Sequence, residues 1–333
     1  MNPDELAILQ SLRAEGLVRS EDARMTPFGG GVSSDVWRVD DGGKSFVVKR
    51  SVAKLRVAAD WYADPARLIY EFRYLQTVSR LVPGVVPAVL NPDISGGYIA
   101  MEFLGEGFTN WKQDMLDGSA DPVVAERAAT ALAKIHNSTR NDATVRSEFD
   151  SLRFFTQLRI DAYLRATALK HPKLANQIEE EAQRLSRSSE CLVHGDFSPK
   201  NMLVSKDRFV VLDCETAWFG EPAFDLAFLL NHLHLKALHH SPKDIGMAAL
   251  VQGATDAYFA TSDGEAPRDL NLRTARLLLV LMLARVDGKS PVEYLSNQPE
   301  KQAYIREFVT HRLGKNLLLQ AISQEWFGSV NPS

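Results

Sequence analysis

The sequence predicts an α+β protein with two lobes, a small β-rich lobe followed by a larger helical lobe. Short strand-like runs are concentrated before residue 104, whereas helical periodicity fills most of the chain after it. Gly105 and Gly107 follow the last of the early strand-like runs, and glycines there indicate a boundary. We therefore assign residues 1–104 to the N-lobe and residues 105–333 to the C-lobe. A chain of 333 residues is long enough for two such units without a disulfide or a metal to hold them.

The N-lobe pattern begins with a helix and continues mainly as strands. A helix signal ends at Gly16, and the turn sequence Asp41-Gly42-Gly43 separates two alternating runs, which predicts a hairpin behind a glycine-rich loop. Pro65 is suited to the first turn of a helix, and Pro83 can end it. The predicted elements are, in chain order, a helix over 4–16, strands over 36–39 and 46–49, a helix from 65 to 82, and strands over 85–90 and 98–104.

The C-lobe pattern is mostly helical, interrupted by short β-like pieces in its middle. The segment 123–136 is a clear example, because its apolar residues recur on one helix face. Helices are predicted over 123–136, 154–169, 224–238, 248–259, 270–286 and 300–319, and short β-like pieces over 192–194, 201–204 and 209–213.

Composition excludes several classes of function. The net charge of -4 provides no overall basic field, so we expect neither a nucleic acid nor a membrane surface as a partner. No apolar run approaches the roughly 20 residues that span a membrane, and the first residues lack a secretory pattern. The only two cysteines, Cys191 and Cys214, fit a reducing compartment. We expect a cytoplasmic protein that is a monomer or a homodimer.

The chemistry of the chain is concentrated in a loop and in the strand that follows it. His194-Gly195-Asp196 is followed by Asn201, and Asp213 comes directly after the apolar run 209–212. Phosphoryl transfer needs one carboxylate that orients or deprotonates the attacking hydroxyl. It also needs a carboxamide and a second carboxylate that hold a metal on the nucleotide phosphates. Asp196, Asn201 and Asp213 fill these roles in that order. The alternative is a loop in which the Asp and Asn side chains only cap turns.

Upstream residues agree with a nucleotide site. The segment Gly29-Gly30-Gly31-Val32-Ser33-Ser34 lies between predicted strands, where glycines let backbone N–H groups approach phosphates and serines add donors. Lys49 ends the next strand and can reach the α- and β-phosphates, while Glu71 on the following helix can pair with it. Each of these residues alone could be an ordinary loop or surface residue. The prediction depends on their order along the chain, in which a glycine-rich loop, a lysine on a strand and a glutamate on a helix follow one another.

With these motifs the chain resembles the aminoglycoside phosphotransferase/choline kinase family, which has a protein-kinase-like fold. The resemblance covers about residues 24–235 and is strongest over 194–201 and 213–227. It implies ATP and Mg²⁺ as cofactors, Asp196 as the catalytic residue, and Asn201 and Asp213 as metal ligands.

The resemblance also assigns supporting roles. It implies that Lys49 and Glu71 form an ion pair beside the phosphates and that the segment around Glu102 and Phe103 holds the adenine. It further implies that Asp225 braces the catalytic loop without being a catalyst.

Three features refine this interpretation. The chain passes from Asp213 to Pro222 without room for the activation segment of a protein kinase. The Asp213-Cys214-Glu215 motif is similar to the Asp-x-Glu arrangement of 5-methylthioribose kinases, so Glu215 is a further candidate metal ligand, unless it only makes a local hydrogen bond. Lys200 could supply a cation near Asp196, or it could be an ordinary solvated lysine.

Arg285 is the candidate substrate residue, binding an anionic or hydroxyl group of the acceptor. Because it follows a strongly apolar helix, the alternative is a solvated charge at a helix end. The predicted function is ATP-dependent transfer of a phosphoryl group to a hydroxyl of a small metabolite, such as an amino alcohol, a sugar or an aminoglycoside-like amine. The alternatives are a non-catalytic nucleotide-binding pseudokinase and a protein kinase.

Overall fold

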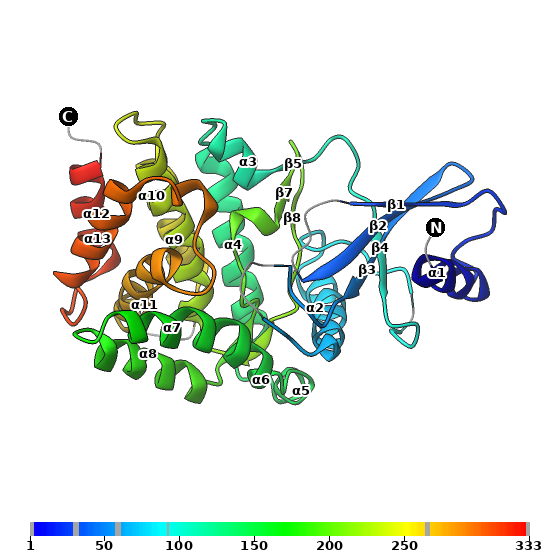
Figure 1. The fold of residues 1–333 in the computed structure, drawn as a ribbon, viewed down its shortest axis with the longest axis horizontal. Coiled ribbons are helices and arrows are strands. Elements are labelled where there is room, and N and C mark those ends of the chain that lie inside the picture. Colours follow the sequence, from blue (N-terminus) through cyan, green and yellow to red (C-terminus); the bar gives the residue numbers. More distant parts are fainter. Residues whose placement is uncertain (1–2, 29–32, 57–60, 92, 264–266, 331–333) are drawn as a thin grey trace.

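A computed structural model describes residues 3–28, 33–56, 61–91, 93–263 and 267–330. It has a sheet-containing lobe at one end and a helical lobe at the other, with α1 (Pro3–Ala14) and α13 (Leu319–Val330) at opposite ends of the long axis (Figure 1). This arrangement confirms the predicted fold class of a small β-rich lobe and a larger helical lobe. No helix in these ranges is both long enough and apolar enough to cross a bilayer.

The N-lobe is built on an antiparallel sheet in the order β1-β2-β3-β4. Its strands are β1 (Arg24–Pro27), β2 (Ser34–Asp41), β3 (Lys44–Ser51) and β4 (Ile99–Glu102). The predicted hairpin is present, and its turn is possible because Gly42 and Gly43 both have positive φ. Val36 pairs with Lys49 across the hairpin, which fixes the register of the candidate lysine. The helix α1 packs its apolar face against this sheet through Ile8, Leu9 and Leu12.

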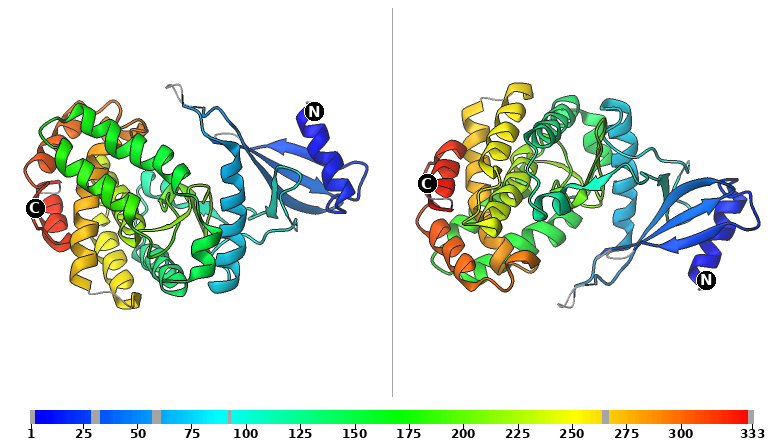
Figure 2. Two further views of the ribbon diagram at one scale, coloured as in Figure 1. Left: turned by 90° about the horizontal axis from the view of Figure 1, so that it is seen from below. Right: turned by 90° about the horizontal axis from the view of Figure 1, so that it is seen from above.

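The helix α2 (Leu68–Leu81) connects the sheet to the rest of the protein. It follows a short 3₁₀ turn, Pro65–Arg67, in which Asp64 accepts a hydrogen bond from Ala66 N–H as a cap. In both views of Figure 2, α2 lies between the sheet and the C-lobe helices. Its buried face, which includes Glu71, Phe72 and Leu75, belongs to the part of the core that joins the two lobes.

The C-lobe surrounds a large apolar core with α9 and α11 near its centre. Its helices are α3 (Trp111–Leu116), α4 (Pro122–Thr139), α5 (Ala143–Glu148), α6 (Leu152–Phe155), α7 (Ala166–Lys170), α8 (Ala175–Arg187), α9 (Pro222–His240), α10 (Met247–Thr261), α11 (Pro267–Asp287), α12 (Pro299–Thr310) and α13. The C-lobe also contains two small sheets, in the orders β5-β7-β8 and β6-β9, and the loops with Asp196 and Asp213 follow two of their strands. The strands are β5 (Thr109–Asn110), β6 (Cys191–Val193), β7 (Met202–Val204), β8 (Phe209–Val211) and β9 (Trp218–Gly220).

Three predicted elements differ from the structure. The strand predicted over 85–90 is irregular, with only an isolated bridge at Val89, and Pro87 lacks the N–H that a regular ladder needs. The helix predicted over 300–319 ends at Thr310, and Gly314 in the left-handed region separates it from α13. The helix predicted over 154–169 contains a π-helical stretch, Thr156–Arg165.

Candidate functional site

The ammonium group of Lys49 connects two carboxylates that lie far apart in the sequence. Its Nζ is 2.7 Å from Glu71 Oε1 and 2.6 Å from Asp213 Oδ1. Lys49 comes from β3, Glu71 from α2, and Asp213 from the loop after β8, so three elements meet at this point. Burial opposes the charge of Lys49, but Asp213 and Glu71 outweigh it and raise the pKa of the lysine. The predicted ion pair is therefore present in the structure.

Asp213 and Glu215 lie beside this ion pair. One ligand oxygen from each of Glu71, Asp213 and Glu215 can be chosen so that all three lie within 4.8 Å of one another. Asp213 has a φ of 61°, a conformation that costs free energy for most residues and is found at functional sites. The side chain of Asp213 is 30% exposed, so this carboxylate can also reach a ligand.

Arg67 is the main partner of Glu215. Its guanidinium is fully buried, donates to Glu215 Oε2 at 2.8 Å and also donates to the backbone oxygen of Ser33 at 2.6 Å. This contact places the start of β2, where the glycine-rich loop ends, next to the Asp-x-Glu motif. The sequence did not single out Arg67, because an arginine in the first turn of a helix is normally a surface charge.

The charge in this region is unbalanced. Three carboxylates, those of Glu71, Asp213 and Glu215, face two cations, Lys49 and Arg67. Burial, together with the charge of Asp213, raises the pKa of Glu215, and burial raises the pKa of Glu71 to about 7 against the opposing effect of Lys49. Excess negative charge and hard oxygen donors are what a divalent cation requires. The residues therefore fit the metal that the sequence predicted.

Asp196 lies on the buried loop after β6 and is held by two cations. Arg159 Nη2 is 3.1 Å from Asp196 Oδ2, and Lys200 Nζ is 2.9 Å from the same oxygen. Burial alone would raise the pKa of Asp196, but Lys200 and Arg159 lower it below its usual value, so the side chain is a carboxylate at neutral pH. Lys200 is therefore a partner of Asp196. Asn201 donates from its amide to the backbone oxygen of Asp196 at 3.0 Å, which ties the two ends of the loop together.

Asp225, at the start of α9, holds the backbone of this loop. It accepts hydrogen bonds from the N–H groups of His194 at 2.7 Å and Gly195 at 2.9 Å. His136 from α4 lies 3.5 Å from Asp225 and is hydrogen-bonded through Nδ1 to the Tyr258 hydroxyl at 2.8 Å. Gly195 has a φ of 77°, and a Cβ there would lie 2.5 Å from the Thr216 oxygen, so glycine is required. These contacts fit the predicted bracing role of Asp225.

We expect Asp225→Asn to lower the free energy of unfolding by about 2–3 kcal/mol, because one buried backbone N–H loses a charged acceptor and faces an amide NH₂ instead. Urea denaturation measures this change. Asp207→Asn is the control, since Asp207 is exposed and should change stability by less than about 0.5 kcal/mol. Equal stability of the two variants would show that Asp225 does not brace the loop.

The other residues that the sequence predicted to bind the nucleotide make no direct contact with Lys49 among the contacts described. Gly30 and Gly31 lie outside the described residues. The Ser33 hydroxyl is near enough to Glu215 to oppose the rise in the pKa of that carboxyl, and Ser34 is buried at the start of β2. The carboxylate of Glu102 pairs with Arg208, with Oε2 at 2.9 Å from Nη2, so its side chain is occupied within the protein.

Phe103 follows β4 and packs against Phe28, which comes directly after β1, and Arg38 of β2. Its ring stacks on Phe28 at 6.3 Å between centroids and lies 4.6 Å below the guanidinium of Arg38. Adenine binding at Glu102 and Phe103 stays a prediction.

Arg285 is not a solvated helix end. The residue is 7% exposed, its Nη1 is 2.9 Å from the Tyr163 hydroxyl, and it also donates to the Ser290 hydroxyl at 3.1 Å. The guanidinium of Arg159 lies 5.5 Å from the Tyr163 ring, so Tyr163 connects Arg285 to the cation that contacts Asp196. The structure thus brings Arg285 into the neighbourhood of the loop that carries Asp196. The sequence missed Arg159, although its spacing of four residues from Phe155 and from Tyr163 places it on the apolar helix face.

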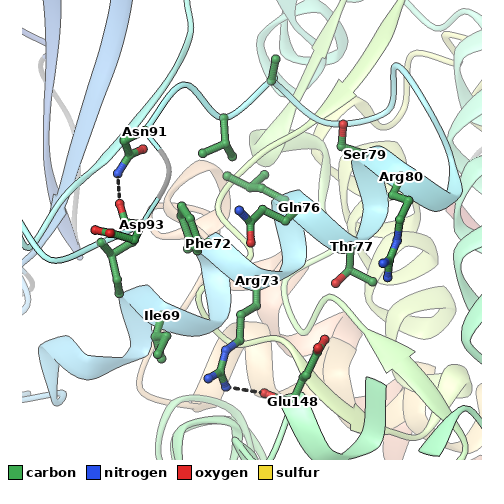
Figure 3. A pocket seen from close by; sticks show the side chains of 14 residues that line it. Ile69, Phe72, Arg73, Gln76, Thr77, Ser79, Arg80, Asn91, Asp93 and Glu148 are labelled. Atoms are coloured by element: carbon green, nitrogen blue, oxygen red, sulfur yellow. Dashed lines mark hydrogen bonds between the residues drawn. The ribbon is translucent and has the colours of Figure 1, made fainter. Parts of the chain in front are cut away.

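A groove of about 810 Å³ lies elsewhere, between α2 and residues 88–94. Figure 3 shows it lined by Ile69, Phe72, Arg73 and Gln76, with Arg73 hydrogen-bonded to the backbone oxygen of Glu148 at 2.7 Å. None of the candidate site residues lines this groove. The candidate site therefore consists of Lys49, Glu71, Asp213 and Glu215, together with the loop that carries Asp196 and Asn201.

Comparison with known proteins agrees with the motifs. The profile of the phosphotransferase enzyme family matches residues 24–270. Methylthioribose kinase 2 of Oryza sativa subsp. japonica is 23% identical over 219 residues, covering 57% of this chain and 51% of that protein. A methylthioribose kinase of Bacillus cereus (strain AH820) is 24% identical over 263 residues, covering 69% and 65% respectively. The matched region is thus less than two thirds of the length of either relative.

A solved structure shows the same architecture. A choline/ethanolamine kinase family protein from Mesorhizobium loti superposes with a TM-score of 0.54 at 16% identity, over 90% of this chain and 94% of that one. At this identity the similarity establishes the fold, which is the protein-kinase-like fold that the motifs implied. The family match extends over most of the chain and includes every candidate residue from Gly30 to Glu215. The chain therefore belongs to the phosphotransferase enzyme family.

Proposed function

We propose that this protein is an ATP-dependent kinase that transfers the γ-phosphoryl group to a hydroxyl of a small metabolite. The observation that carries the proposal is the convergence of Lys49, Glu71 and Asp213 within ion-pair distance, next to a buried, ionised Asp196. The charge of Asp213 acts on Asp196, and Lys200 influences both, so the two carboxylates belong to one site. These parts are the ones that phosphoryl transfer requires.

On the nucleotide side, Lys49 would bind the α- and β-phosphates while Glu71 holds its ammonium group. Gly30, Gly31, Ser33 and Ser34 would cover the phosphates. The segment at Glu102 and Phe103 would hold the adenine. The support is the register of Lys49 on β3 and the buried pair that it forms with Glu71.

The metal would be Mg²⁺, held by Asp213, Asn201 and Glu215. When bound, it neutralises charge on the phosphate oxygens and fixes their orientation. Asn201 already uses its amide N–H on the Asp196 backbone, which leaves its side-chain oxygen for a cation. Each of Asp213 and Glu215 has one oxygen on a cation, but the Asp213 side chain is 30% exposed and that of Glu215 only 8%, so Asp213 would be the principal ligand.

On the acceptor side, Asp196 would accept a hydrogen bond from the attacking hydroxyl, align it with the phosphorus and take up its proton as the new bond forms. A carboxylate with a lowered pKa is a weak base, so its main contribution would be orientation. Arg159 and Lys200 would keep it ionised and fixed in position.

Two alternatives are less well supported. A pseudokinase lacks one or more catalytic groups, whereas Asp196 and Asp213 are both present here and in contact with cations. A protein kinase uses an activation segment, whereas only four residues, 214–217, separate Asp213 from β9, and α9 follows almost at once. The acceptor would therefore be a free metabolite. The two free, buried cysteines are consistent with the cytoplasm as its location.

The direct test is ADP release from Mg-ATP in the presence of a panel of amino alcohols, pentoses, methylthioribose, hydroxyamino acids and aminoglycosides. We expect one class to stimulate ADP release and EDTA to abolish the stimulation. Nucleotide binding without ADP release for any acceptor, and without slow hydrolysis of ATP to water, would favour the pseudokinase.

A further inference from the structure

Lys236 is a buried lysine in the middle of α9. The residue is 1% exposed, and its Nζ lies 5.2 Å from the centre of the Tyr294 ring. Within the described part of the chain, Nζ has neither a hydrogen-bond acceptor nor a carboxylate at ion-pair distance. A buried amino group without a hydrogen-bond acceptor or a paired anion lowers stability, whether it is charged or neutral. Its presence therefore calls for an explanation outside packing.

Two cations, Lys112 and Arg285, act on Lys236. Arg285 and His232 are both buried, and His232 lies about one helical turn before Lys236 on α9. Burial and then Lys112 lower the pKa of Lys236 to about 7, with a further contribution from Arg285 and only Glu293 opposing. Glu293 itself forms an ion pair with Lys112 and does not neutralise Lys236. Burial, Lys236 and Arg285 likewise hold the pKa of His232 well below its usual value.

Several polar atoms of this region are buried without a partner among the described residues. They are Arg285 Nε, His232 Nε2 and the Tyr294 hydroxyl. Unsatisfied buried polar groups are uncommon in folded proteins. Their concentration around Lys236 indicates a place where a ligand completes the hydrogen bonding.

This cluster is continuous with the candidate site. Arg285 donates to the Tyr163 hydroxyl, Tyr163 packs under the guanidinium of Arg159, and Arg159 contacts Asp196. The charge of Lys200, the other partner of Asp196, also acts on His232. A molecule bound at this cluster would thus lie on the same side of the C-lobe as the carboxylate that would orient its hydroxyl.

We propose that the acceptor carries an anionic group, a carboxylate or a phosphate monoester, and that Lys236 and Arg285 bind this group. The choice of anion over amine follows from the charge, because a cationic acceptor would add a positive charge to an already uncompensated cluster. The inference rests on the proposed function only in calling the bound molecule the acceptor, whose hydroxyl would receive the phosphoryl group. Binding of the anion can be measured without phosphoryl transfer.

The test uses four three-carbon compounds that share hydroxyl groups and differ in one substituent: glycerol, 3-amino-1,2-propanediol, D-glycerate and glycerol 3-phosphate. Binding to the full chain with saturating Mg-ADP is measured by calorimetry at constant ionic strength. We expect glycerate or glycerol 3-phosphate to bind at least tenfold more tightly than the neutral and amino compounds. The two anions distinguish a carboxylate from a phosphate. No preference for either anion overturns the proposal.

Lys236→Met provides the matched variant, and Lys289→Met, which removes an exposed lysine nearby, is the control. We expect Lys236→Met to lose the anion preference by at least tenfold and to unfold at a higher temperature, because a buried amino group without a hydrogen-bond acceptor is removed. Lys289→Met should bind like the wild type. An unchanged preference in Lys236→Met, or a lower unfolding temperature that reveals an internal partner, overturns the proposal. Should Lys236→Met not fold, Arg285→Gln tests the same preference.

Two readouts separate this inference from the proposed function. Because the pKa of Lys236 is about 7 without a ligand, anion binding at pH 7.5 should take up a proton, and the binding heat should vary with the ionisation enthalpy of the buffer. Anion preference without ADP release would retain the anion site and refute phosphoryl transfer. ADP release with only neutral or amino acceptors would support the transfer and refute the anion site.

Discussion

Asp196→Asn should reduce acceptor-dependent ADP release by about 10²–10⁴-fold, the range expected when a positioned acid–base group is lost. The amide cannot take a proton from the hydroxyl, and its NH₂ group would face Arg159 and Lys200, which both donate to this position. Nucleotide affinity should change little, because Asp196 makes no contact with Lys49 among the contacts described. Steady-state kinetics and a separate Mg-ATP binding measurement test the two halves of this prediction.

The control for this variant is Asp207→Asn, an exposed position in the turn before β8. It makes the same chemical change a short distance along the chain and should retain wild-type activity. An Asp196→Asn variant with a kcat close to that of the wild type would refute the assignment of Asp196. A loss of ATP binding in the same variant would point to misfolding of the loop.

Asp213→Asn is expected to have the second large effect, a loss on the order of 10³-fold in kcat/KM. This loss corresponds to about 4 kcal/mol of charge stabilisation from a metal ion in the transition state. Asparagine is suited to this test because, like aspartate, it tolerates the positive φ of 61° at this position. The backbone should therefore stay in place while one carboxylate of the three is removed from the cluster.

The distinguishing measurement for Asp213→Asn is the dependence of the rate on metal concentration. We expect a higher metal concentration to be needed for half-maximal rate and Mn²⁺ to restore activity better than Mg²⁺, since Mn²⁺ binds a nitrogen- or oxygen-containing site more strongly. A variant with lower kcat but unchanged metal dependence would show that Asp213 serves mainly as the partner of Lys49 and not as a metal ligand.

The wrong element predictions share a physical cause. Over 85–90 the apolar residues suggested a strand, but only the neighbouring segment decides whether a ladder forms, and Pro87 removes one of its donors. Over 300–319 the apolar periodicity continues across Gly314, whereas the left-handed backbone there divides the pattern into two helices. The spacing of apolar residues indicates which side chains are buried, but it does not show where the backbone turns or which segment pairs with it.

Arg67 and Arg159 show why part of the site escaped prediction. Both are arginines in helical or near-helical segments, where sequence reasoning expects a solvated charge, and both become buried only because a carboxylate from another element comes to them. Lys236 differs, because it is the only Lys, Arg, Asp or Glu from 226 to 240, where the other residues are apolar except for four histidines and Asn231. A helix that is apolar on all faces is buried, so a single charge in it indicates function.

The sequence by itself determined the fold class and the family, since these depend on local spacing and on the order of short motifs along the chain, and it predicted which residues would perform phosphoryl transfer. Tertiary structure decided which charges meet. Lys49 and Asp213 are separated by 164 positions and Arg67 and Glu215 by 148, yet each pair is in direct contact. Such pairing depends on how the two lobes pack, and burial then sets the pKa of each group, which no local pattern contains.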